Sequence, residues 1–122
     1  MNAQESPWMD DDLRMLREAV SRYVETEMLP NEPRWRAQHH VDRETWRAVG
    51  EAGFLLMDVP AEYGGGGGDF RHEAVLYEEL ARRGISGFGQ GVHSIAAHYV
   101  LNYGTEEQKQ RWLPRMARGE LI

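Results

Sequence analysis

The chain has 122 residues, of which 41% are hydrophobic, a length that fits one domain with a modest core. Its net charge of −6 leaves no basic stripe for phosphates, so nucleic acid is not predicted as a partner. Cysteine is absent, which excludes disulfides, thiolate catalysis and cysteine-ligated metals. No apolar run reaches the roughly 20 residues of a membrane span, and no leader pattern opens the chain, so we expect a cytoplasmic protein.

The first predicted helix follows a short tail. Residues 1–9 show no periodic pattern and are predicted to be disordered. Asp10 and its two neighbours suit a helix N-terminus, and apolar residues then recur at steps of three and four as far as Met28. Pro30 disfavours helix just before it, so the helix is predicted to end or kink near Met28. The polar run 31–40 is left with two alternatives, a further helical turn or an irregular connection.

A second helix is predicted over Arg43–Ala52, with Asp42 as N-cap and Gly53 just past its end. Trp46 and Val49 share its apolar side. Both are predicted to face the core.

A break in the pattern follows at Pro60 and at five consecutive glycines, Gly64–Gly68. The apolar run Phe54–Met57 before it is too short for a periodic element and is predicted to be a buried connector. Each glycine costs roughly 0.5–1 kcal/mol relative to alanine inside a helix, so a tight or flexible loop is predicted. A phosphate cradle is disfavoured, because no Lys-Ser/Thr follows and Asp69 stands where a dinucleotide fingerprint needs glycine.

Two helices are predicted next, over 70–83 and 86–103. The first has a wide apolar stripe and Gly84 after its end, which indicates burial on more than one side. The second carries no formal charge and is predicted to be a central helix surrounded by the others. Glycines at 87, 89 and 91 loosen its beginning.

The last segment opens on a capping box, Thr105 with Gln108. A helix is predicted through Leu113, and Pro114 is predicted to start a further short helix that ends near Gly119. The chain therefore reads as an all-α bundle of five or six helices with a glycine-rich loop.

No metal site is predicted from the histidines. His93 and His98 are five residues apart, about 140° around a helix, and His39 and His40 are adjacent. The Glu-x-x-His pairs of a di-iron bundle are also missing.

No catalytic residue is assigned from the carboxylates either. Glu73, Glu78 and Glu79 lie on one predicted helix and are interpreted as a solvated face paired with Arg82 and Arg83.

The glycines at 87, 89 and 91, interleaved with Phe88 and Val92, remove side chains from one end of an apolar helix. An apolar ligand slot and close packing between helices explain this pattern equally well.

Several motifs follow one another in a recognisable order over residues 10–122: Pro60–Gly65, Glu78–Arg82, Gly87–Ser94, Gly104–Lys109 with Leu113-Pro114, and Gly119-Glu120. Their order resembles the N-terminal α-helical domain of the acyl-CoA dehydrogenase family, and is most similar to its long-chain members. The longer glycine run after Tyr63 departs from the family pattern and puts the geometry of that loop in doubt.

The resemblance implies an oxidoreductase that converts acyl-CoA thioesters to trans-2-enoyl-CoA with FAD, which an electron-transferring flavoprotein reoxidises. It also implies a homo-oligomer, and a middle β-domain and C-terminal helical domain that hold the base and most FAD contacts. Those domains are absent from these 122 residues, so this chain alone is predicted to be inactive and its cofactor-binding residues stay unknown. The part of the acyl-chain pocket wall that the resemblance assigns here is Gly87, Phe88, Gly91, Val92 and Ile95. The alternative is a free-standing or degenerate helical interaction subunit without catalysis.

Overall fold

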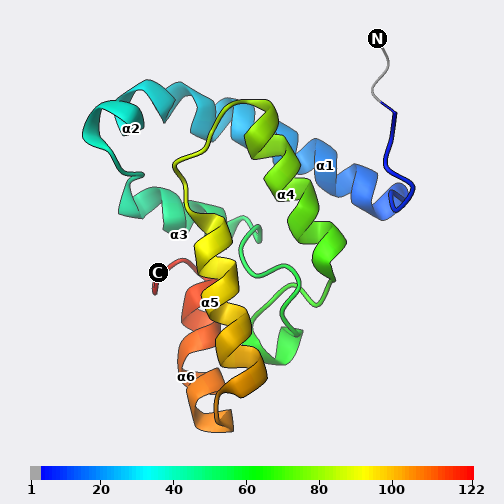
Figure 1. Cartoon of the computed structure of the whole chain (residues 1–122), viewed down its shortest axis with the longest axis vertical. Coiled ribbons are helices and arrows are strands. Elements are labelled where there is room, and N and C mark those ends of the chain that lie inside the picture. The colour runs from blue at the N-terminus through cyan, green and yellow to red at the C-terminus, as the bar shows by residue number, and fades with distance from the viewer. Residues whose placement is uncertain (1–3) are drawn as a thin grey trace.

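The computed structural model describes residues 4–122 and shows a helical bundle, with no strand in that range (Figure 1). The all-α prediction is confirmed. The α-helices are α1 (Asp11–Tyr23), α2 (Glu32–Gln38), α3 (Arg43–Glu51), α4 (Phe70–Arg82), α5 (Gln90–Tyr103) and α6 (Glu106–Ala117). None of the helices in the described range has the length and apolarity needed to cross a membrane.

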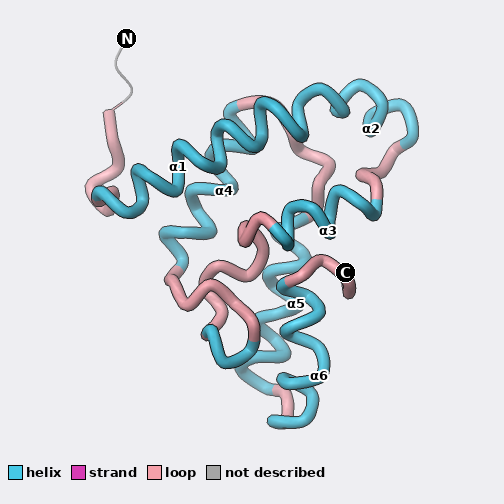
Figure 2. The backbone as a smooth tube through the Cα atoms, turned by 180° about the vertical axis from the view of Figure 1, so that it is seen from behind, coloured by secondary structure: helices cyan, strands magenta, loops and turns pink. Residues whose placement is uncertain are grey.

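The first helix continues beyond its predicted kink. Asp10 caps α1 by accepting a hydrogen bond from the N–H of Leu13 at 2.9 Å. A π-helical turn, Val24–Met28, and a 3-10 turn that contains Pro30 then lead into α2 (Figure 2). Pro33 lies in the first turn of α2, where its missing N–H costs nothing. Of the two alternatives for residues 31–40, the helical one is correct.

Asp42 is the N-cap residue of α3, as predicted, but its side chain makes no cap hydrogen bond and instead joins α2 to α3. Its carboxylate accepts hydrogen bonds from Trp35 Nε1 at 3.3 Å and from Gln38 Nε2 at 2.8 Å, and it pairs with Arg34. Gly53 takes the left-handed conformation after α3, as predicted. These contacts fix the turn between the two helices.

The five-glycine loop is tight. All five of its N–H groups donate to backbone oxygens of residues 56–61, at distances of 2.8 to 3.2 Å. A Cβ atom at Gly65 would lie 2.1 Å from the carbonyl oxygen of Val59, so glycine is required there. The connector before the loop is buried at Leu55, Leu56 and Met57, as predicted.

The interpretation of the α4 carboxylates as a solvated face is wrong for two of them. Glu73 and Glu79 are only 3% and 1% exposed. Glu79 pairs with Arg83 at 2.5 Å, and Arg17 of α1 approaches it at 3.8 Å. Because α4 packs along α1, an arginine from the other helix makes burial of the carboxylate tolerable.

The prediction of a central, surrounded helix is also wrong in part. α5 packs against α6 as an antiparallel pair (Figure 1), and His93 Nε2 lies 2.9 Å from the Met116 carbonyl oxygen of α6. His93, Ser94 and Ala97 are buried. Its other side is exposed at Val92, which is 74% accessible. A helix that is apolar on all sides is normally buried. The exposed side of α5, however, lacks a neighbour within the described residues.

α6 is one helix and not two. The capping box forms: Thr105 Oγ1 accepts from the N–H of Gln108 at 3.1 Å, and Gln108 Oε1 accepts from the N–H of Thr105 at 2.9 Å. Pro114 lies inside the helix. Leu113 and Met116 lie on its buried side, so packing maintains the helix through the proline.

The predicted tail over 1–9 lies partly outside the described residues, at 1–3. In the remainder, Met9 is buried, Trp8 packs against the core, and the N–H of Met9 donates to the Ser6 carbonyl at 3.0 Å.

Candidate functional site between α4 and α5

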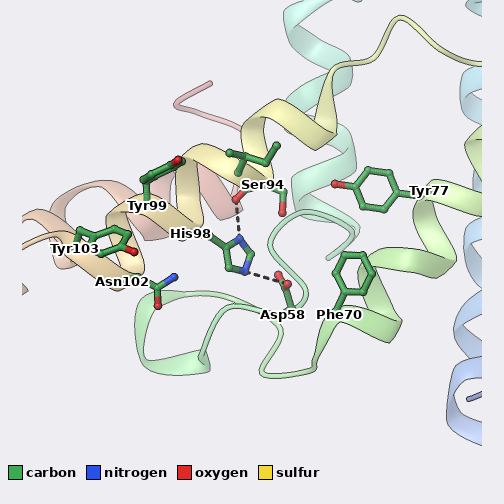
Figure 3. Close-up of a pocket in the computed structure, with 9 residues that line it drawn as sticks. Asp58, Phe70, Tyr77, Ser94, His98, Tyr99, Asn102 and Tyr103 are labelled. Atoms are coloured by element: carbon green, nitrogen blue, oxygen red, sulfur yellow. Dashed lines mark hydrogen bonds and ion pairs between the residues drawn. The ribbon is translucent and has the colours of Figure 1, made fainter.

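A cleft of about 390 Å³ lies between α4, α5 and the connector at Asp58 (Figure 3). We call it the α4–α5 cleft. Its walls are largely aromatic. They are formed by Phe70 and Tyr77 of α4 and by Ile95, Tyr99 and Tyr103 of α5.

The floor of the cleft is polar. His98 Nε2 lies 3.0 Å from Asp58 Oδ2, and His98 Nδ1 lies 2.7 Å from the Ser94 carbonyl oxygen (Figure 3). Both ring nitrogens therefore face acceptors, and a protonated ring donates to both. The other carboxylate oxygen of Asp58 is buried without a hydrogen-bond partner. The contact between His98 and Asp58 ties the segment before the glycine loop to the middle of α5.

Glu73 lies on α4 near this floor. One of its oxygens accepts a hydrogen bond from the backbone N–H of Met57 at 3.1 Å. Burial, and then the nearby Asp58 carboxylate, raise the pKa of Glu73 to about 7, while the Met57 N–H, His98 and Ser94 act in the opposite direction. Glu73 is thus a buried acid that gains or loses its proton near neutral pH.

Tyr77 fills the space that a side chain at position 91 would take. A Cβ atom built at Gly91 would lie 3.3 Å from Tyr77 Cε1 and 3.4 Å from its hydroxyl oxygen. Burial, and then the charge of Glu73, raise the pKa of Tyr77. Of the two explanations left open for these glycines, close packing holds at Gly91, which accommodates a tyrosine from α4.

The structure separates the five residues assigned to the pocket wall. Ile95 lines the α4–α5 cleft, Val92 is exposed beside it and Gly91 lies under Tyr77. Phe88 points into the core, with its ring centroid 4.3 Å from that of Trp46. Gly87 lines a separate hollow beside α2. Their role in binding stays a prediction.

Sequence reasoning missed most of the cleft. Phe70, Tyr77 and His98 line it, and Glu73 lies near its floor, but none was singled out as a binding residue. Glu73 and Tyr77 are four residues apart, the spacing that places two side chains on one helix face. Asp58 carries no local signal, since its partner is 40 positions further along the chain.

The described residues offer neither a cluster of metal ligands nor free N–H groups in the glycine loop. No group of three or more metal-ligating side chains forms within residues 4–122. The glycine loop cannot offer its N–H groups to a phosphate, because all five already donate within the protein. The arrangement is suited to holding an apolar group between aromatic walls over a hydrogen-bonding floor.

Large apolar side chains are also exposed around the cleft. Accessibility is 67% for Phe70, 59% for Ile95, 65% for Tyr99 and 82% for Tyr103. Together with Val92, we call them the α5 face. A contiguous exposed apolar surface of this kind indicates a binding site for a ligand or another protein surface.

Comparisons with known proteins agree with the helical fold. The family model "Acyl-CoA dehydrogenase, N-terminal domain" matches residues 10–120. The long-chain specific acyl-CoA dehydrogenase of Mus musculus mitochondria is 36% identical over 109 residues, which is 88% of this chain but 25% of that protein. This chain thus spans about a quarter of the length of that relative.

Solved structures give the same result. The crystal structure of an acyl-CoA dehydrogenase from Geobacillus kaustophilus superposes with a TM-score of 0.91 and 38% identity, over 97% of this chain and 31% of that one. A glutaryl-CoA dehydrogenase from Mycobacterium smegmatis in complex with FADH2 gives 0.84 and 32%, over 93% of this chain and 30% of that one. The chain therefore belongs to the acyl-CoA dehydrogenase family, as an N-terminal domain of that family.

Proposed function

We propose that this chain serves as the N-terminal domain of an FAD-dependent acyl-CoA dehydrogenase and contributes a wall of the acyl-chain pocket. The observation that supports this is the α5 face, an exposed apolar surface that continues into the α4–α5 cleft. Ile95 belongs to both. Val92 lies three residues before it on the exposed side of α5, so an acyl chain that runs along this face meets both, whereas Gly91 is covered by Tyr77.

The physical basis is burial of hydrocarbon. Each methylene removed from water contributes about 0.8 kcal/mol, and the α5 face offers side chains that are themselves solvated. An acyl chain between this face and a second surface would remove both from water.

The flavin would be held elsewhere. When bound, FAD accepts the hydride from the acyl β-carbon, but the glycine loop of this chain supplies no phosphate cradle for it, since its N–H groups are all engaged. The part played by this chain is to bind and orient the acyl chain and to exclude water from one side of it.

The partners proposed are an acyl-CoA substrate, an electron-transferring flavoprotein and further copies of the same protein. One related chain comes from a structure described as the electron transferring flavoprotein of Acidaminococcus fermentans, with a TM-score of 0.79 and 30% identity. This supports a functional connection between the family and that carrier. A cytoplasmic location remains part of the proposal.

The test is expression of the complete reading frame in which the gene places these residues. We expect a flavin absorbance spectrum and acyl-CoA-dependent reduction of a dye. Ile95→Glu should lower kcat/KM for acyl-CoAs, whereas Met15→Glu, which places the same charge on an exposed residue of α1, should not. Equal effects of the two variants would contradict the pocket-wall role. A frame without flavin or dehydrogenase activity would favour the interaction subunit, whose partner would then cover the α5 face.

A further inference from the structure

Two cavities meet at Tyr77. The α4–α5 cleft is one, and a second of about 420 Å³ lies further along the same helices, lined among others by Leu80, Ile85 and Gln90. Among the described residues Tyr77 is shared by their linings, so its side chain forms part of the wall of both.

Contacts from α5 hold the ring in this position. Gly91 brings the α5 backbone within van der Waals distance of the ring, as the 3.3 Å spacing from an ideal Cβ position shows. The ring of Phe70 lies on the other side, with centroids 6.5 Å apart. In Figure 3 the Tyr77 side chain extends from α4 toward α5, with its hydroxyl on the side of Ser94.

The Tyr77 ring lies against α5 at Gly91, about one helical turn from Ile95. Gly91 is four residues before Ile95, which is about 6 Å at the helical rise of roughly 1.5 Å per residue. A chain that enters beside Ile95 and follows the helix meets Tyr77 after one turn. Beyond the ring the second cavity is apolar at Leu80 and Ile85.

We infer that Tyr77 is a gate between the two cavities and limits the length of the acyl chain that the cleft accepts. This inference rests on the proposed acyl-wall function. With the ring in place, a chain that enters at Ile95 ends in the first cavity. With the ring removed, the two cavities join and the chain extends to Ile85. Tyr77 is thus a specificity-determining residue supplied by α4, opposite a glycine of α5.

The experiment is methyl NMR on the protein expressed from the complete reading frame, with isotope-labelled isoleucine and leucine methyls. Octanoyl-CoA and hexadecanoyl-CoA are titrated in turn, with free CoA as the reference. In the wild type, both should shift the Ile95 methyl and leave Ile85 and Leu80 unchanged. In Tyr77→Ala, hexadecanoyl-CoA should also shift Ile85 and Leu80, while octanoyl-CoA should not.

Affinity gives a second readout. Hexadecanoyl-CoA should bind Tyr77→Ala more than about tenfold tighter than it binds the wild type. Burial of two further methylenes contributes about 0.8 kcal/mol each, which together exceeds the roughly 1.4 kcal/mol of a tenfold change in affinity. Octanoyl-CoA should bind the two proteins equally. Tyr77→Phe retains the ring and should behave as the wild type. Tyr77→Leu replaces Tyr77→Ala if the latter does not fold.

The outcomes separate the two claims. If the Ile95 methyl responds but Ile85 and Leu80 stay silent in the smaller variants, the gate is wrong and the acyl wall stands. If hexadecanoyl-CoA already shifts Ile85 in the wild type, the ring does not close the second cavity and the gate is also wrong. If Ile95 responds to neither thioester in any variant, the acyl-wall function itself is overturned, and the gate with it.

Discussion

The Glu73→Gln variant should be more stable than the wild type at pH 8, and its free energy of unfolding should vary less with pH. Glu73 is 3% exposed and its carboxylate has a single backbone donor, the N–H of Met57. Glutamine has almost the same shape, and its carbonyl oxygen can still accept that hydrogen bond. It differs in that no charge has to be buried when the pH rises.

The expected size follows from the pKa. Burial raises the pKa of Glu73 from 4.5 to about 7, and each pKa unit corresponds to about 1.4 kcal/mol. A folded-state pKa above the unfolded one means that the folded state binds more protons, so the contribution of Glu73 to stability is complete below pH 4.5 and is lost as the pH rises through 7. The loss amounts to about 3 kcal/mol. Asp69, whose pKa hydrogen bonds from Arg71 lower to about 2, affects stability only at pH values below this range.

The assay is urea denaturation from pH 4.5 to pH 8. The free energy of unfolding of Glu73→Gln, minus that of the wild type, should rise by about 3 kcal/mol across this range. Glu107→Gln, the same change at an exposed residue of α6, is the matched control and should show no comparable rise. A difference between Glu73→Gln and wild type that stays constant with pH would refute the reasoning about the buried acid.

Two further predictions concern stability. Gly65→Ala should destabilise the protein by several kcal/mol in the same denaturation assay, because its Cβ would lie 2.1 Å from the Val59 carbonyl oxygen. The control is Gly87→Ala, whose Cβ meets nothing within 4 Å and which should change stability by less than about 0.5 kcal/mol. Similar values for both variants would show that the loop is looser than described. Glu79→Gln should cost about 1.5–3 kcal/mol, because it removes the buried carboxylate that pairs with Arg83 and leaves that guanidinium with only the more exposed Glu25. Arg14→Ala, which breaks only exposed pairs, should cost no more than about 1 kcal/mol, and an equal loss at both sites would contradict the assignment of Glu79 as a buried pair.

The helix ends were predictable because their signals are local. Asp10 caps α1, Thr105 and Gln108 form the predicted box, and Gly53 and Gly84 adopt the left-handed backbone that follows a helix. Each of these features depends on residues within four positions of one another. The family resemblance, which also rests on local motifs in order, was confirmed.

The features that sequence reasoning missed depend on contacts between distant residues. Glu79 is covered by α1, from which Arg17 approaches it at 3.8 Å, and Asp58 pairs with His98, 40 positions further along the chain. The apolar pattern of α5 was interpreted as evidence of a surrounded helix, because periodicity shows that a face avoids water but not what covers it. The sequence could not decide between a slot and close packing at Gly91, because the residue that packs there, Tyr77, comes from α4.

The most direct test of the account is to locate where an acyl chain touches the protein. An acyl-CoA with a photoreactive diazirine at the end of its chain is irradiated with the protein, and the labelled peptides are identified by mass spectrometry after tryptic digestion. All of α5 lies in one tryptic peptide, residues 84–109. The account predicts that the label concentrates on this peptide at Ile95 and its neighbours, and that Ile95→Glu abolishes it. Label that falls mainly on α1 to α3, or that is unaffected by Ile95→Glu, would contradict the account.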